Sequence, residues 1–486
     1  MNIEAVKRAV AGFREARQRG DRLPLIDSAR VLISERAPIG DQWPNLWSEL
    51  VTWGEMDLAI SAIEEWGRQG GPRDQVAYEK AVILAQVGRT NEAAALMRQV
   101  PENVPDPLAN AHFRGALCSN LDQPDRAEKH FRDAIAIQPR FGRVWVALAD
   151  LGRLTGDDAA QILRDFTQPF AGEDLDLAAA HSALGSYYHS LKDFERAFEH
   201  YRKSHEVSAK SYHYDPAENR ESARISASWN RASIAQHSVI SDESPRQPIF
   251  VAGLPRSGTT LVSQILSAHS AVDGGAELGL SRQLEATVGG FAPHDFERFV
   301  AGGGTPESLR EIYLRLAAER IPGNGKFVDK SLNHGRALGP LSALFPDSPV
   351  VWMRRDPLDN AWSIYRTWLP RNVISGWAPA DIVDHMSVED ELFDHWSKVL
   401  GDRMLAVSYA DLVADPDRWI DRITRHCGLE PEEAQLRFHE QGGSVLTASA
   451  QQVRRPINRA GIGVAEPYRE MLGEFTDALA RQDREA

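Results

Sequence analysis

Residues 253–260 read GLPRSGTT and lie between two apolar runs, at 249–252 and 261–266. Gly253 and Gly258 enclose four residues, which is the spacing of a phosphate-binding loop between a strand and a helix. Glycine lets the backbone curl until several N–H groups point inward, and the following helix adds its positive end. Thr259 stands where such loops usually carry lysine. The stretch predicts an anion-binding loop; a purely structural glycine turn is the alternative.

From residue 249 onward, short apolar segments alternate with longer amphipathic stretches. They cover residues 249–252, 326–329, 349–353 and 404–408. This alternation predicts an α/β domain with a parallel sheet. Ligands of such sheets bind at the carboxyl ends of the strands, where the GLPRSGTT loop begins.

The amino-terminal half shows a different, repeating pattern. Gly54, Gly88 and Gly156 are separated by 34 residues or by twice that number, and this period is typical of tetratricopeptide repeats. In the clearest copy, Gly115 and Ala127 are small where two antiparallel helices must approach closely.

These patterns together predict two domains. The first is an all-α tetratricopeptide solenoid over residues 1–240, and the second is an α/β P-loop-like domain over residues 241–486. The boundary is placed in the polar stretch SDESPRQP, residues 241–248, which shows no apolar periodicity.

Composition excludes several classes of protein. A net charge of −14 argues against a general nucleic-acid or membrane-surface binder, because both need basic faces. The two cysteines, Cys118 and Cys427, lie far apart and fit no metal-ligand pattern, so we expect neither a metal site nor disulfides. No signal peptide or membrane span is evident in the sequence, so a cytoplasmic location is expected.

A second candidate anion subsite lies in VVWMRRDPLDNAWSIYRTWL, residues 350–369. Asp356 and Pro357 predict the start of a helix. Arg355 then lies at the strand-to-helix junction, and Ser363 follows about two helical turns later. Taken alone, the Arg-Asp-Pro turn also fits a simple helix cap.

The PRSGTTL stretch followed by an Arg-x7-Ser segment resembles the sulfotransferase family, and in particular tyrosylprotein sulfotransferases and bacterial tetratricopeptide–sulfotransferase fusions. The resemblance implies a P-loop-like fold that binds 3′-phosphoadenosine-5′-phosphosulfate (PAPS) without a metal. It assigns the 3′-phosphate of that donor to Arg355 and Ser363. It assigns the 5′-phosphosulfate to five consecutive residues: Arg256, Ser257, Gly258, Thr259 and Thr260.

The same resemblance suggests the reacting groups. Glu277 stands 21 residues after Arg256, where relatives carry a glutamate that acts as the base. Lys330 in FVDKSLNH matches a family lysine that stabilises charge on the transferring group. His334 and His269 are rival bases.

Later segments resemble further parts of the family's nucleotide site. Tyr409 in AVSYADLVADP is expected near the nucleotide, Ser449 near the sulfate, and Arg455 where the site closes. Many relatives next carry a basic residue and a tryptophan, but Val464 and Ala465 stand there in this chain. That contact is either missing or supplied by an arginine of the preceding stretch.

The leading hypothesis is a PAPS-dependent sulfotransferase that acts on an acceptor hydroxyl of a peptide tyrosine, a sugar, a lipid head group or another small molecule. One alternative is a kinase or ATPase with a degenerate P-loop, for which Asp329 is the candidate magnesium ligand. Another is a non-enzymatic scaffold. Repeat arrays commonly bind a peptide or protein on their concave face, so a protein acceptor is possible. The alternative is that the repeats serve only as a structural support for the second domain.

Overall fold

The computed structural model describes residues 2–166, 172–211, 213–240, 246–332, 334–368, 377–440 and 453–485. Its amino-terminal half is a series of antiparallel helix pairs. The helices are α1 (Ile3–Arg19), α2 (Arg22–Ser34), α3 (Trp43–Thr52), α4 (Met56–Arg68), α5 (Arg73–Gln86), α6 (Thr90–Met97), α7 (Pro107–Asn120), α8 (Pro124–Ile137), α9 (Gly142–Asp150), α10 (Gly156–Asp165), α11 (Asp174–Ser190) and α12 (Phe194–Ser208). The predicted all-α solenoid is confirmed.

Glycines in the repeat register explain how two of these pairs pack. A Cβ atom added to Gly115 of α7 would lie 2.4 Å from the Phe131 ring of α8. A Cβ atom added to Gly185 of α11 would likewise lie 2.6 Å from the Tyr201 ring of α12. Because each aromatic ring fills the space of the missing side chain, the helices approach closely and bury the rings.

The carboxy-terminal half contains a five-stranded parallel sheet in the order β2-β3-β1-β4-β5. The strands are β1 (Pro248–Ala252), β2 (Val272–Ala276), β3 (Lys326–Asp329), β4 (Val350–Arg354) and β5 (Met404–Ser408). The predicted α/β class with a parallel sheet is confirmed. The central strand β1 has neighbours that connect in opposite directions, and in such sheets ligands bind beyond the carboxyl end at this switch point.

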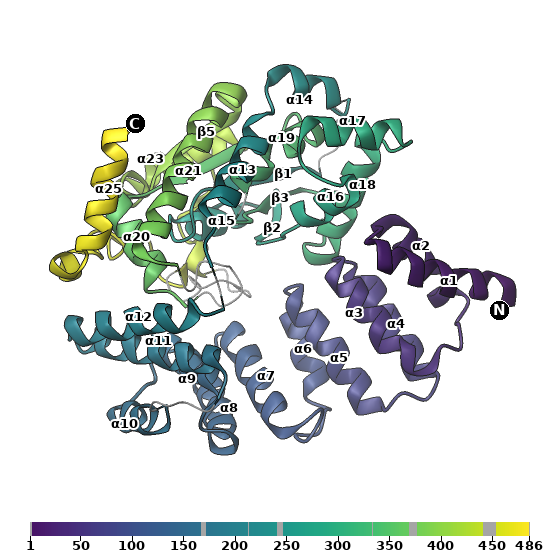
Figure 1. Ribbon diagram of the computed structural model, residues 1–486, viewed down its shortest axis with the longest axis horizontal. Helices are drawn as coiled ribbons and strands as arrows, with labels where there is room; N and C mark the ends of the chain where they lie inside the picture. The colour runs from purple at the N-terminus through teal and green to yellow at the C-terminus, as the bar shows by residue number, and fades with distance from the viewer. Residues whose placement is uncertain are drawn as a thin grey trace.

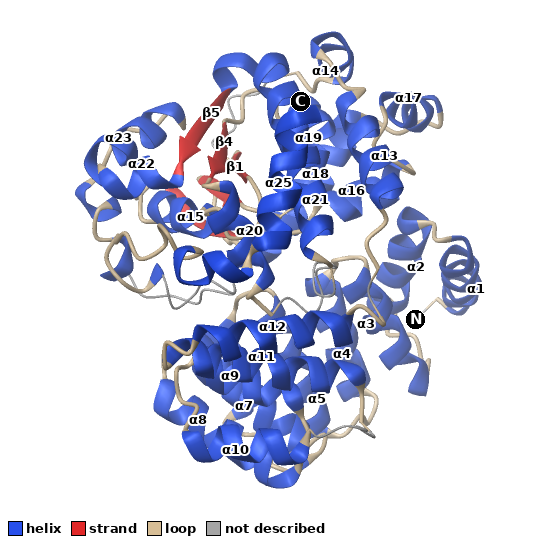
Figure 2. Ribbon diagram, turned by 60° about the vertical axis from the view of Figure 1, so that its left-hand side comes forward, coloured by secondary structure: helices blue, strands red, loops and turns tan. Residues whose placement is uncertain are grey.

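Alternate residues of the strands pack against two helical layers. Ile249 and Val251 of β1 belong to a core with α15 (Thr259–Ser267), α22 (Tyr409–Ala414) and α23 (Pro416–His426). Phe250 and Ala252 face a core with α18 (Pro306–Arg320), α19 (His334–Leu344) and α21 (Pro379–Leu400). Figure 2 shows the strands between these helices. The helices after the repeats are α13 (Pro216–Ala227), α14 (Arg231–His237), α15 (Thr259–Ser267), α16 (Ser281–Val288), α17 (Pro293–Ala301), α18 (Pro306–Arg320), α19 (His334–Leu344), α20 (Pro357–Tyr365), α21 (Pro379–Leu400), α22 (Tyr409–Ala414), α23 (Pro416–His426) and α25 (Gly473–Glu485), with the 3₁₀ helix η5 (Glu466–Met471) before α25.

The repeat array follows an arc beneath the α/β domain and touches it at both ends (Figure 1). At one end, α2 and α4 contact α16 and α18. At the other end, one continuous apolar core joins α7–α12 to α20, α21, η5 and α25. The array therefore has two separate docking sites on the α/β domain.

The domain boundary expected at residue 241 stays a prediction. Helices α13 and α14, which precede it, pack against α19 and α21 of the α/β domain. None of the helices in the described part of the chain is both long and apolar enough to cross a membrane.

Candidate functional site

The loop after β1 is a tight turn that glycine makes possible. Gly253 and Gly258 have φ angles of 132° and 108°, in a region that disfavours other residues. A Cβ atom at Gly258 would also lie 2.8 Å from the Tyr409 ring. Ser257 closes the turn, because its N–H and its hydroxyl both donate to the Leu254 carbonyl, at 3.2 and 2.7 Å. The loop thereby delivers the side chain of Arg256 and the first turn of α15 to the sheet edge.

A cavity of about 280 Å³ lies beside this loop, at the carboxyl ends of β1 and β4. The two predicted anion subsites share it: Arg256 Nε lies 3.4 Å from the Ser363 hydroxyl oxygen, to which it donates. Seven residues predicted for donor binding line the cavity, namely Arg256, Gly258, Thr260, Arg355, Ser363, Tyr409 and Arg455. The buried Ser257 and Thr259 do not line it.

Arg355 ties the walls of the cavity together. Its guanidinium donates to the carbonyl oxygens of Arg256, at 2.7 Å, and Gly461, at 2.5 Å. The guanidinium also lies 5.2 Å from the centre of the Tyr409 ring. Its Nε atom is buried and has no hydrogen-bond partner among the described residues. A buried donor of this kind is costly unless an acceptor reaches it, which fits an anionic ligand.

The cavity concentrates positive charge. Burial, together with the nearby Arg366 and Arg355, lowers the pKa of Arg256 to about 10. Sequence reasoning missed Arg366, which follows α20 one helical turn after Ser363 and lines the same cavity. Its signal was the three-residue spacing from Ser363, since residues three apart share a helix face. An anion with several negative charges is the ligand that offsets such a cluster.

The repeat array places an acidic residue near these cations. Asp150 ends α9 and keeps solvent-accessible surface. Loss of hydration among the neighbouring residues raises the pKa of Asp150 to about 6, and Arg256 opposes that rise. A repeat side chain therefore contributes to the electrostatic field of the cavity.

Glu277 and Lys330 form an ion pair at the carboxyl ends of β2 and β3. The Lys330 side chain is 3% exposed and that of Glu277 33% exposed. Burial lowers the pKa of Lys330, an effect that Glu277 opposes. The carboxylate thus lies on the open side of the pair, where a hydroxyl could approach it, and the ammonium lies inside.

The buried Asp329 is engaged within the fold. Its two carboxylate oxygens accept hydrogen bonds from the hydroxyls of Tyr313 and Ser331, both at 2.5 Å. His334 Nε2 lies 3.2 Å from one of them. These contacts hold the pKa of Asp329 below its ordinary value. Asp329 is thus committed to Tyr313, Ser331 and His334, which weakens the case for it as the magnesium ligand of a nucleotide-hydrolysing site.

Both rival histidines are buried, and none of the three candidate bases, Glu277 included, lines the cavity. His334 is buried against Asp329, with its Nε2 atom 2.9 Å from the carbonyl of that residue. His269 uses both ring nitrogens for backbone contacts, to the Glu430 carbonyl at 2.8 Å and the Ala271 N–H at 3.0 Å. Among the candidate bases, Glu277 is therefore the one with an accessible side chain.

The segment that departs from the family pattern is held by Asp359 of α20. Its carboxylate accepts the backbone N–H groups of Gly463 at 2.7 Å and Ala465 at 3.0 Å. Val464, between them, lines the cavity. Arg454 points to the repeats instead, where it pairs with Asp122 at 2.9 Å. Ser449 lies outside the described residues.

The model of the sulfotransferase family matches residues 248–433, which include β1 to β5. Residues 248–433 therefore form a sulfotransferase-family domain. A tetratricopeptide-repeat model matches residues 178–210 within α11 and α12. The predicted combination of tetratricopeptide repeats and a sulfotransferase domain in one chain is confirmed.

Two of the curated relatives show how much of this chain is matched. An uncharacterized protein of Aquifex aeolicus is 24% identical over 415 residues, which cover 82% of this chain and 54% of the relative. Protein-tyrosine sulfotransferase 1 of Danio rerio is 27% identical over 227 residues, covering 43% of this chain and 63% of the relative. This chain therefore spans about half to two thirds of the length of these relatives.

Among solved structures, the sulfotransferase domain of the Synechococcus PCC 7002 olefin synthase matches at 22% identity with a TM-score of 0.36. The match covers 47% of this chain and 90% of that domain.

Proposed function

We propose that this sulfotransferase domain moves the sulfuryl group of PAPS to an acceptor hydroxyl. The observation that carries the proposal is the convergence of Arg256, Ser363 and Arg355 on one cavity. Besides burial, the charge of Arg256 also lowers the pKa of Lys330, which links this cavity to the Glu277–Lys330 pair. A donor with phosphate at the 3′ position and phosphosulfate at the 5′ position matches a cavity that collects cations from two loops.

The residues of the cavity divide the work of binding. The β1 loop and the start of α15 would hold the 5′-phosphosulfate through backbone N–H groups and Arg256. Arg355, Ser363 and Arg366 would hold the 3′-phosphate, and the Nε of Arg355, which has no partner among the described residues, provides one donor for it. Tyr409 offers an aromatic face next to these cations. Bound PAPS would supply the activated sulfuryl group.

In the transfer step, Glu277 would act as the base and Lys330 would stabilise the negative charge on the leaving group. Glu277 takes the proton of the acceptor hydroxyl as its oxygen forms a bond to sulfur. The bond between sulfur and the phosphate oxygen breaks, and that oxygen keeps the electron pair in the departing adenosine 3′,5′-bisphosphate. Lys330 stabilises the charge on this leaving oxygen once Glu277 has accepted the proton and the ion pair weakens. No atom other than the transferred sulfuryl group and the proton changes partner.

Turnover with labelled PAPS and a panel of hydroxyl acceptors tests the proposal. The panel should include tyrosine peptides, sugars and lipid head groups. A parallel thermal-shift series should compare adenosine 3′,5′-bisphosphate with ATP and magnesium. We expect stabilisation by the bisphosphate and its release during turnover. Stabilisation by ATP and magnesium alone would favour the kinase or ATPase alternative, and no response to either nucleotide would favour a scaffold.

A further inference from the structure

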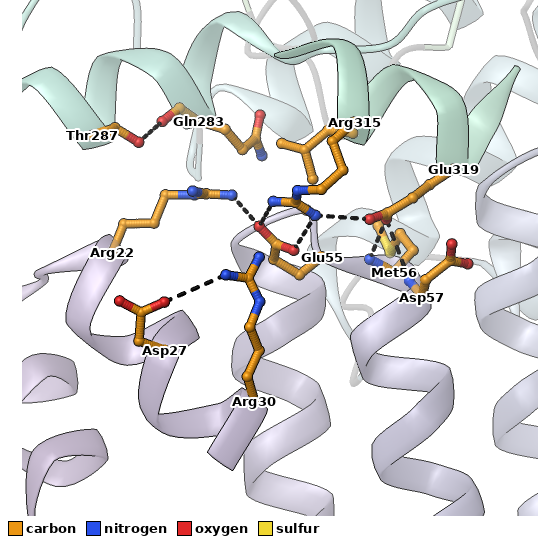
Figure 3. Close-up of polar contacts among 12 residues, drawn as sticks. Arg22, Asp27, Arg30, Glu55, Met56, Asp57, Gln283, Thr287, Arg315 and Glu319 are labelled. Atoms are coloured by element: carbon orange, nitrogen blue, oxygen red, sulfur yellow. Dashed lines mark hydrogen bonds and ion pairs between the residues drawn. The ribbon is translucent and has the colours of Figure 1, made fainter. Parts of the chain in front are cut away.

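A buried ionic network joins the first repeats to the sulfotransferase domain (Figure 3). Glu55, just before α4, is fully buried and pairs with Arg22 of α2, whose side chain is 1% exposed. The same carboxylate receives a forked contact from Arg315 of α18, at 2.5 and 2.6 Å. A two-pronged contact of this kind fixes orientation as well as distance.

A second carboxylate of α18 extends the network. Glu319 accepts the backbone N–H groups of Met56, at 2.8 Å, and Asp57, at 3.3 Å, so the sulfotransferase domain caps the amino terminus of a repeat helix. Arg315 also donates to Glu319, at 3.1 Å. Burial, together with the nearby Glu55 and Asp57, raises the pKa of Glu319 to about 7, and Arg315 opposes this rise.

The turn between α3 and α4, which contains Gly54 and Glu55, also contacts the segment that carries Glu277. A Cβ atom on Gly54, with its φ of 78°, would lie 3.1 Å from the Gln283 amide nitrogen of α16. Helix α16 begins at Ser281, shortly after Glu277. On the other side, the Gly279 N–H donates to the Ser331 hydroxyl at 2.8 Å. The loop with Glu277 is therefore held between Ser331 and a helix that the repeat turn contacts.

The other docking site of the array joins α11 and α12 to α20 and η5. The His205 ring of α12 stacks on Tyr365 of α20, with ring centres 3.9 Å apart. His189 of α11 lies 2.7 Å from the Tyr468 hydroxyl. Helix α20 also carries Ser363, so this docking site adjoins the donor cavity. The Glu55 docking site instead adjoins the loop that carries Glu277.

We propose that Glu55 is a positioning residue: its docking of the first repeats on α16 and α18 holds Glu277 in place for sulfuryl transfer. The inference rests on the proposed function for the role of Glu277. It assigns the repeat array a part in the chemical step that is separate from acceptor binding. Weakening this docking site should slow turnover while leaving donor affinity unchanged.

Glu55→Gln in the full chain tests the proposal, since it keeps the shape of the side chain and removes the charge. We expect kcat at saturating PAPS to fall about 10- to 100-fold, the scale for a misplaced reacting group. The Kd of adenosine 3′,5′-bisphosphate should stay within about twofold of its value for the unmodified protein, because the donor cavity lies at the other docking site. Hydrogen exchange of the peptide over residues 272–288 should become faster.

Two further variants keep the test decisive. Glu4→Gln removes an exposed carboxylate that pairs with Lys7 at 3.2 Å, and it should change none of the three readouts. If Glu55→Gln does not fold, Arg315→Lys keeps the charge of the network and loses only the fork.

Unchanged kcat with faster exchange would overturn the proposal, as would a parallel loss of kcat and bisphosphate affinity. Unchanged exchange of residues 272–288 would overturn it as well. If the unmodified protein neither turns over PAPS nor binds the bisphosphate, the proposed function fails, whereas the exchange experiment still shows whether Glu55 holds the loop.

Discussion

Arg355→Lys is the sharpest test of the donor cavity, because the substitution keeps the charge and removes the fork. Arg355 spans the carbonyls of Arg256 and Gly461 while its Nε remains without a partner in the described structure. A lysine ammonium cannot make both carbonyl contacts and still present a third donor in the same plane. If Arg355 binds the 3′-phosphate, the variant should lose one charge-assisted hydrogen bond to that group.

A hydrogen bond to a charged group contributes about 1.5–3 kcal/mol, so the Kd of adenosine 3′,5′-bisphosphate should rise about 10- to 150-fold. Calorimetric titration measures this change directly. Adenosine 5′-monophosphate, which lacks the 3′-phosphate, is the reference ligand. Its affinity should fall much less, because it loses only the support that Arg355 gives to the β1 loop.

Arg354→Lys provides a matched control at the neighbouring position. The Arg354 side chain is 48% exposed and pairs with Asp390 at 3.0 Å, away from the cavity. This variant should bind both nucleotides like the unchanged protein. Equal losses for the two nucleotides in Arg355→Lys, or no loss for either, would refute the assignment of Arg355 to the 3′-phosphate.

Three further predictions concern the base, the repeats and pH. Glu277→Gln should lower the single-turnover rate about 10²- to 10⁴-fold with an unchanged bisphosphate Kd; a normal rate would exclude Glu277 as the base. Gly115→Ala should destabilise the protein by about 1–3 kcal/mol in thermal unfolding because its methyl group meets Phe131, whereas Gly473→Ala, with open space around it, should not. Because the pKa of Glu319 is raised from 4.5 to about 7 in the folded protein, Glu319 binds its proton more tightly in the folded state than in the unfolded state. The contribution of Glu319 to the free energy of unfolding should therefore fall by about 3 kcal/mol as pH rises from 4.5 to 7, and the difference between denaturant titrations of the unmodified protein and Glu319→Gln should show this slope.

Local patterns were sufficient for most of the fold. The 34-residue register placed small residues where helices cross, and apolar segments predicted β1, β3, β4 and β5. Strand β2 was missed, because Val272–Ala276 contains two glycines and pairs only with β3 at the edge of the sheet. A glycine-rich edge strand owes its conformation to its neighbour more than to its own propensity.

The donor cavity was predictable in part. The loop glycines and the Arg-x7-Ser spacing indicated Arg256, Arg355 and Ser363, since backbone geometry and helical spacing are local properties. Arg366 joins them in the same cavity; its three-residue spacing from Ser363 indicated a shared face, but an arginine is more often a solvated surface residue, so the spacing alone did not identify it.

What the sequence by itself determined is the order of elements and the anion-binding character of the loop, because both depend on short-range steric and hydrogen-bonding rules. Only the tertiary structure decided which charges meet. Glu277 and Lys330 are 53 residues apart, and Glu55 and Arg315 are 260 apart. Buried charges become stable only when an oppositely charged partner reaches them, and that partner is chosen by the packing of the sheet and the repeats.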